Sequence, residues 1–413
     1  MKIEKKKKIA GKYIFSGLFK TTIQILAGFV IFRWIDPKSL GYWQSFTVIV
    51  SYLTILNLGV TVGINREIPY WIGKGNNSRG LTLLQTAKYY VRILGLLMIL
   101  IGSLFGLFFY IFEIINLEGF TFLILALVLT TFNLNVDLFG ATYRSSSAFN
   151  RLANIQFVLT VLYILFIPLI YYFEIWGYIF YLLLISAKTV FLLSCYSPLK
   201  AKHKFRKEDF IYLVKVGLPI YFWNYVNSQI QSFPRLVLIL IGTPYLVGLY
   251  APSWSIRQAM LNIPKYTNRY LFPQMSHRYG KTDSQKQVSQ FAIRSAIYLF
   301  SLTFLGGAVF AYSLNYIFPV FFPEYQEGIV AAQIMIFSGV FYGTNLIFHN
   351  ALNALMNIKI FKTIIGLKVV TIFLTTYLAS NIFSSLLVAV SIGSLLSEMV
   401  VAILYYINLN RLK

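Results

Sequence analysis

Apolar runs of about twenty residues, each bounded by charged or turn residues, recur along the whole chain. A helix of this length spans the hydrocarbon core of a bilayer. The pattern predicts helices over 13–35, 42–64, 86–112, 120–142, 152–173, 177–197, 213–241, 245–270, 291–316, 329–356, 361–380 and 384–408. We therefore expect an all-α polytopic membrane protein with about twelve transmembrane helices.

The composition supports this class. Of the 413 residues, 58% are hydrophobic and 12% are charged, whereas a soluble domain carries about a quarter charged residues. The single cysteine, Cys195, excludes an internal disulfide. Lys5 to Lys8 precede the first apolar stretch, but no small-residue cleavage site follows it, so we expect an uncleaved first span.

Positive charge strongly exceeds negative charge, with 36 Lys and Arg against 13 Asp and Glu and a formal net charge of +23. If the number of spans is even and both termini are cytoplasmic, most basic residues fall in or near cytoplasmic segments, as the positive-inside rule requires. The run 245–270 is the least apolar. If it is counted as a span, the distribution of basic residues still agrees with the positive-inside rule. The charge thus indicates orientation and attraction to anionic membrane lipids, and we expect no nucleic-acid partner.

The two halves of the chain resemble each other at a shift of 207 residues. Pro37 and Gly41 match Pro244 and Gly248 in equivalent predicted outer turns. Six spans per repeat would give two six-helix lobes related by a pseudo-two-fold axis along the membrane normal. The expected organisation is a basic cytoplasmic N-terminus at 1–12, an N-lobe at 13–197, a basic linker at 198–212, a C-lobe at 213–408 and a cytoplasmic C-terminus at 409–413.

Polar residues form a stripe on the predicted helix 213–241, because steps of three, four, seven and eleven residues return to one helical face. Lys20 and Gln24 share a face in the first helix, and the 207-residue shift places Gln24 on Gln231. Arg257 lies near the middle of a helix that is too polar to face lipid. The residues expected to line a central cavity are Lys20, Gln24, Asn224, Asn227, Gln231, Arg235 and Arg257.

Each intramembrane charge also has a plainer interpretation. Lys20 and Arg235 lie close enough to a membrane face to snorkel, and Arg257 could form a structural ion pair with a neighbouring helix. Asp137 and Glu398 could carry a coupling H⁺ or Na⁺ or could neutralise a structural cation. Lys368 is a candidate partner for Glu398.

Arg66 and Lys74 lie in the segment that follows the second predicted span. Tyr70 and Trp71 between them are typical of an interfacial anchor, and the two cations could also meet phosphates of an entering lipid. The chain shows no nucleotide-binding or metal-binding motif, so we expect no cofactor beyond a coupling ion. Its short predicted loops leave no room for a soluble catalytic domain.

The segment Asn65 to Pro69, the Leu40-Gly41-Tyr42 turn and the duplicated twelve-span layout resemble bacterial polysaccharide-biosynthesis flippases of the Wzx type. These are members of the multidrug/oligosaccharidyl-lipid/polysaccharide (MOP) exporter superfamily. The resemblance implies alternating access in the bacterial cytoplasmic (inner) membrane. It implies a cargo of undecaprenyl-diphosphate-linked oligosaccharide for O-antigen, capsule or exopolysaccharide, with glycosyltransferases and a polysaccharide polymerase as partners. It also implies that Lys20 and Arg257 lie on facing helices.

Three alternatives remain open on the sequence. An exporter of organic cations would have the same architecture but would need acidic residues in its cavity. A peptidoglycan-precursor flippase usually has two further spans. A membrane-embedded enzyme, either a polymerase or an acyltransferase using His349, would need a larger loop than any predicted here.

Overall fold

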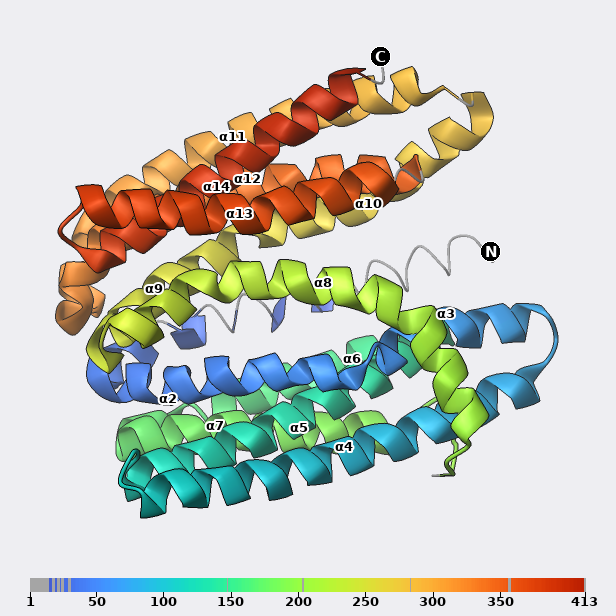
Figure 1. Cartoon of the computed structure of the whole chain (residues 1–413), viewed down its shortest axis with the longest axis horizontal. Coiled ribbons are helices and arrows are strands. Elements are labelled where there is room, and N and C mark those ends of the chain that lie inside the picture. The colour runs from blue at the N-terminus through green and yellow to red at the C-terminus, as the bar shows by residue number, and fades with distance from the viewer. Residues whose placement is uncertain are drawn as a thin grey trace. The chain divides into compact units, whose positions relative to one another are not determined.

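The computed structural model describes residues 15–16, 19–20, 23, 26–28, 31–146, 148–202, 204–282, 284–355 and 358–411. All regular structure in this described part is helical, which confirms the all-α prediction (Figure 1). The described residues between Phe15 and Trp34 are helical. The elements that follow are α2 (Pro37–Ser51), η1 (Tyr52–Asn57), α3 (Val60–Gly73), α4 (Asn77–Ile111), α5 (Leu117–Ser145), α6 (Phe149–Leu165), α7 (Pro168–Cys195), α8 (Lys207–Ile241), α9 (Pro244–Met260), α10 (Asn262–Thr282), α11 (Gln285–Phe321), η2 (Pro323–Gly328), α12 (Ile329–Ala354), α13 (Ile358–Ile382) and α14 (Leu386–Arg411).

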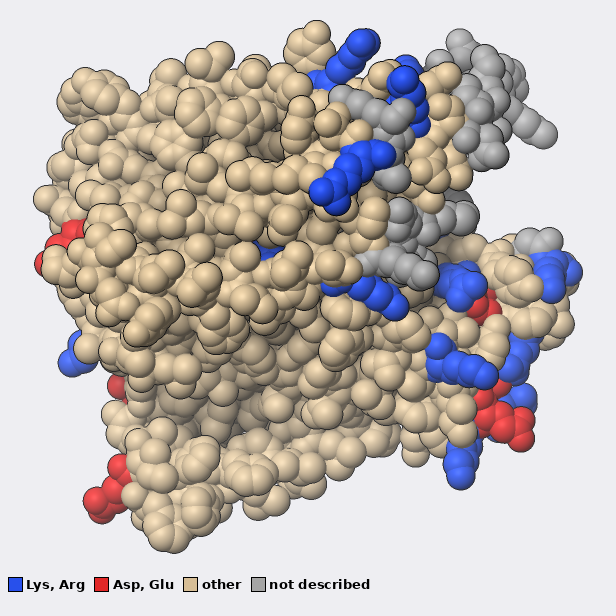
Figure 2. All heavy atoms as spheres, turned by 45° about the horizontal axis from the view of Figure 1, so that its top comes forward, with Lys and Arg blue, Asp and Glu red and all other residues tan. Residues whose placement is uncertain are grey.

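Seven helices in the described part are long and apolar enough to cross a membrane, and a bent pair raises this number to eight. Exposed leucine, phenylalanine and tyrosine side chains cover α4 and α11. In Figure 2 the visible face is mostly uncharged, and most of the Lys and Arg lie in the right half of the view. An apolar surface of this kind is what a lipid-facing protein requires.

Among the described residues three predicted spans are interrupted, so their prediction as continuous helices was wrong. The span 152–173 is interrupted at Phe166 and Ile167, between α6 and α7. The span 42–64 bends by 45° between η1 and α3, because Leu58 and Gly59 both have positive φ angles, 50° and 76°. The span 245–270 is interrupted at Leu261 between α9 and α10. Pro264 follows the break and lacks the N–H that a continuous helix would donate to the preceding turn.

The chain folds into two compact units. Unit 1 contains Tyr42–Tyr225 and the described residues up to Ile35, and unit 2 contains Asp36–Gly41 and Val226–Lys413. The chain therefore passes from one unit to the other just before α2, within α2 and within α8. The predicted linker 198–212 overlaps the segment between α7 and α8, and its last six residues belong to α8.

Within unit 1, the first half of α8 is fixed by polar contacts and by close helix packing. Arg79 Nη1 lies 2.5 Å from Asp209 Oδ1, and the Tyr212 hydroxyl donates to Glu67 Oε2 at 2.6 Å. Gly217 of α8 packs so closely on Gly59 that a side chain on either residue would overlap backbone atoms of the other helix. Glycine permits this approach because it has no Cβ.

Within unit 2, the first turns of α2 and α9 make a reciprocal contact. A Cβ atom on Gly41 would overlap the carbonyl oxygen of Pro244, and a Cβ atom on Gly248 would overlap the carbonyl oxygen of Pro37. These four residues are the ones that the 207-residue shift pairs. The two turns that the shift pairs are thus packed against each other, glycine against proline.

Candidate functional site

Unit 2 holds three charged side chains in its interior, which we call the charge cluster: Arg257 of α9, Lys368 of α13 and Glu398 of α14. Arg257 Nη2 lies 3.3 Å from Glu398 Oε1, and Lys368 Nζ lies 2.9 Å from the same oxygen. None of the three residues is more than 4% exposed. One carboxylate oxygen therefore joins two cations in a buried setting.

Uncharged polar groups complete the first layer around the charge cluster. Arg257 Nε donates to Ser338 Oγ at 3.1 Å, and Arg257 Nη2 donates to Gln231 Oε1. Gln231 Nε2 donates to Glu398 Oε1 at 3.1 Å. Asn345 Nδ2 donates to Glu398 Oε2 at 3.0 Å. Helices α8, α9, α12, α13 and α14 each contribute to this network, so their packing fixes its geometry.

The charge cluster is not neutral. Its two cations face one carboxylate, so the three side chains carry a net charge of +1 in their ionised forms. The Arg257 Nη1 atom is buried and has no hydrogen-bond partner among the residues that the structure describes. A buried donor without a partner is costly, and groups of this kind are often explained by a ligand or an ordered water.

Two aromatic rings border the charge cluster. The guanidinium carbons of Arg235 and Arg257 lie 4.3 Å and 5.5 Å from the ring centroid of Trp254. Arg257 and Lys368 also lie 5.1 Å and 4.9 Å from the ring centroid of Tyr342. These distances are within the range of cation–π attraction. The sequence interpretation missed both rings. The signal available for Trp254 was its place one helical turn before Arg257.

The predicted cavity residues do not all meet. Gln231 and Arg257 belong to the network above, and the Asn227 side chain hydrogen-bonds to Tyr342. Arg235 contacts the ring of Trp254, which also contacts Arg257. Lys20 and Asn224 belong to unit 1, where the half-buried Lys20 lies 5.6 Å from the ring centroid of Tyr163 and Asn224 is exposed. Gln24 lies outside the described residues.

The two acids proposed for ion coupling have different surroundings. Glu398 lies in the charge cluster with Lys368, the candidate partner named from the sequence. Asp137 is exposed on α5, where it interacts electrostatically with Arg144. No group of three metal-ligating side chains occurs in the described part of the chain.

The predicted entry residues lie at the end of α3. Arg66 is exposed, and its Nε atom lies 3.9 Å from Glu67 Oε1. Lys74 Nζ lies 4.6 Å from the ring centroid of Tyr70 and 5.6 Å from that of Trp71. The aromatic anchor and the exposed cations are thus adjacent, as an interfacial segment requires.

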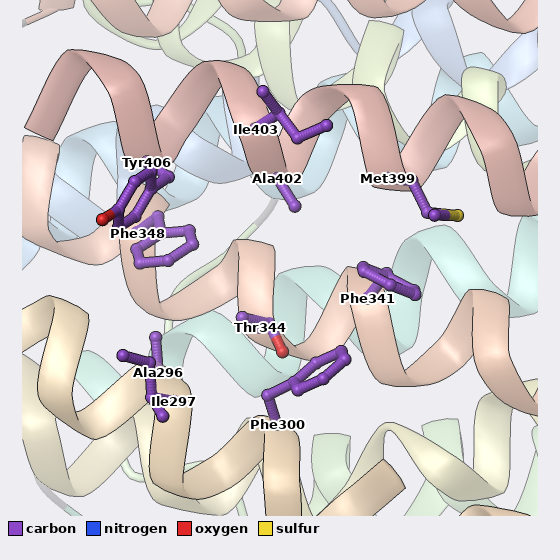
Figure 3. Close-up of a pocket in the computed structure, with 10 residues that line it drawn as sticks. All are labelled: Ala296, Ile297, Phe300, Phe341, Thr344, Phe348, Met399, Ala402, Ile403 and Tyr406. Carbon is purple, nitrogen blue, oxygen red and sulfur yellow. The ribbon is translucent and has the colours of Figure 1, made fainter.

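An apolar groove of about 410 Å³ lies between α11, α12 and α14 (Figure 3). Its lining includes Phe300, Phe341, Phe348 and Met399. The hydroxyl of Thr344, which also lines it, donates to the Val340 carbonyl oxygen. Tyr406 supplies the other side-chain hydroxyl among the ten lining residues, so the groove offers little to a phosphate or a sugar. It suits a hydrocarbon chain and is distinct from the charge cluster.

No family model and no curated protein sequence matches the chain. Several solved structures match almost its whole length. A multidrug resistance MATE family transporter of the MOP superfamily in an inward-facing conformation has a TM-score of 0.77 at 15% identity over 95% of both chains. An outward-facing MATE transporter of that superfamily has a TM-score of 0.66 at 16% identity over 98% of this chain and 96% of the other. The Vibrio cholerae MATE transporter VcmN in its bent form has a TM-score of 0.63 at 14% identity over 98% of both chains. The protein therefore has the fold of the MATE transporters of the MOP superfamily.

Proposed function

We propose that the protein is a flippase that moves undecaprenyl-diphosphate-linked oligosaccharides from the cytoplasmic to the outer leaflet of the bacterial inner membrane. The observation that carries this proposal is that two buried basic side chains, Arg257 and Lys368, share one carboxylate in the charge cluster. A phosphate that leaves water needs cations and hydrogen-bond donors to replace its hydration. A buried site with excess positive charge favours an anionic cargo over a cationic one.

The surroundings of Trp254 fit a diphosphate. Arg235 and Arg257 lie on the same indole ring, so their two guanidinium groups can each take one phosphate of a diphosphate. Guanidinium N–H groups bind phosphate oxygens strongly, and Nη1 of Arg257 is a donor without a hydrogen-bond partner among the described residues. Asn227, Tyr342 and Trp254 supply the amide and the aromatic faces that sugar rings use.

The remaining features have places in the same cycle. Arg66 and Lys74 would meet the headgroup at the cytoplasmic entry, and the polyprenyl tail would stay in lipid. The close contact of Gly41 and Gly248 would hold the outer turns of unit 2 together during an alternating-access cycle. Asp137 would be the candidate for a coupling ion. Glycosyltransferases would supply the cargo, and a polysaccharide polymerase would use it.

A second candidate function is export of organic cations. Two of the matched structures are multidrug resistance transporters, which favours this candidate. The exposed carboxylate of Asp137 would then be the cation-binding group. The charge cluster would have only a structural role, because its carboxylate is already shared by two cations.

Reconstitution in liposomes separates the two functions. We expect the purified protein to make undecaprenyl-diphosphate-linked N-acetylglucosamine on the inner leaflet accessible to an external sugar-modifying enzyme, and to leave ethidium untransported. Protein-free liposomes are the control. Transport of ethidium without movement of the lipid-linked sugar would contradict the proposal and establish the exporter.

A further inference from the structure

The carboxylate of Glu398 is already bound by cationic and amide side chains of the protein, which does not suit a site for a transported cation. Glu398 Oε1 accepts from Lys368, Arg257 and Gln231, and Glu398 Oε2 accepts from Asn345. Both oxygens are therefore occupied. A Na⁺ ion here would meet two positive charges at short range, which is strongly unfavourable in a buried site. The charge cluster as built is not a Na⁺ site.

We infer that the charge cluster is an anion-binding site for one singly charged phosphate group, in which Glu398 is a positioning residue. This inference rests on the proposed function for the identity of the cargo but not for the class of ligand. Glu398 holds Arg257 and Lys368 side by side and neutralises only one of them. The remaining positive charge matches one phosphodiester group.

The geometry also supplies the contact. Arg257 Nε donates to Ser338, and Nη2 donates to Gln231 and Glu398. The Nη1 atom is therefore the donor that a ligand could use. The side chain of Arg257 is only 2% exposed. Gln231, Trp254 and Tyr342 contact Arg257 and are themselves half-buried, so the anion would have to displace at least one of them. A phosphate oxygen at Nη1 would satisfy the donor and bring the total charge to zero.

A charge-balance series tests the inference. Lys368→Met removes the excess charge, and Lys368→Met with Glu398→Gln restores it without restoring the lysine. The probe is didecyl phosphate, a singly charged phosphodiester, bound to the purified full-length protein in nanodiscs of zwitterionic lipid and measured by native mass spectrometry. We expect Lys368→Met to weaken binding by about 10- to 100-fold. The double variant should recover most of this loss.

The controls separate charge from packing. Both variants lose the same lysine contacts, so recovery in the double variant cannot come from packing. Lys368→Gln with and without Glu398→Gln provides a second pair if the first does not fold. Lys188→Met removes an exposed cation from α7 and should bind as the wild type does. Didecyldimethylammonium has the same tails and the opposite charge, and it should not respond to the series.

Two results would overturn the inference. One is wild-type binding of didecyl phosphate by Lys368→Met, and the other is equally weak binding by the single and double variants. A different result would show that the proposed flippase function is wrong while the anion site is right. If the protein binds didecyl phosphate with the expected charge dependence but does not move the lipid-linked sugar, the anion site stands and the flippase does not.

Discussion

Replacing Arg257 by alanine is expected to abolish export of the lipid-linked sugar while leaving folding and membrane insertion intact. The substitution removes the buried Nη1 donor and one of the two guanidinium groups on Trp254. It leaves Lys368 paired with Glu398 at 2.9 Å, so no uncompensated charge stays buried. Loss of a charge-assisted contact to phosphate costs about 1.5–3 kcal/mol per hydrogen bond, which corresponds to at least about tenfold in export. Surface polymer and the amount of membrane-inserted protein are the two measurements.

The control for this prediction is Lys188→Ala, which removes an exposed cation and should export normally. Lys20→Ala should also abolish export if the resemblance places that cation correctly. Arg257→Lys keeps the charge but loses the planar fork, so we expect intermediate export. Wild-type export from Arg257→Ala would show that this arginine is only a structural ion-pair partner, and the proposed phosphate role would fail.

Substituting alanine for Gly41 or Gly248 is the second change with a large expected effect. Either methyl group would overlap a backbone carbonyl oxygen of the facing turn, which cannot rotate away as a side chain can. The first turns of α2 and α9 must then separate, at a cost of about 1–3 kcal/mol. We expect a lower thermal unfolding temperature in detergent. Export should also be reduced if the proposed transport cycle depends on this contact, because the two turns can no longer pack closely.

Gly306→Ala and Gly366→Ala are matched controls, because a Cβ atom at either position would meet nothing within 4 Å. Both lie within helices, where alanine is favoured over glycine. They should therefore match or exceed the wild type in unfolding temperature and export. Unchanged stability and export in Gly41→Ala and Gly248→Ala would contradict a role for this contact in the transport cycle.

The sequence predicted the all-α fold well because the membrane requires long apolar helices, and their pattern is readable without tertiary contacts. It could not predict the break at Leu58 and Gly59. A positive φ at a leucine is set by the surrounding structure and not by local preference. The 207-residue shift identified Pro37, Gly41, Pro244 and Gly248 as equivalent, but only the structure shows that these residues contact one another.

The charge cluster was predictable in part. Arg257 was named with an ion pair as its alternative role, and Glu398 was named with Lys368 as its candidate partner. Helical periodicity assigns a face to each residue on its own helix and does not reveal which helices pack together. Only the structure shows that Arg257 and Lys368, from two other helices, meet at one carboxylate oxygen of Glu398. Trp254 was missed because aromatic residues are abundant in this chain.

The most direct test of the central claim is deletion of the gene in its own host, followed by separate analysis of lipid-linked sugars on the two faces of the inner membrane. We predict that complete oligosaccharide units accumulate on the cytoplasmic face and that surface polymer is lost. The accumulated units would also identify the cargo. If unpolymerised units appeared on the outer face instead, transport would be intact without this protein, and the flippase account would be wrong.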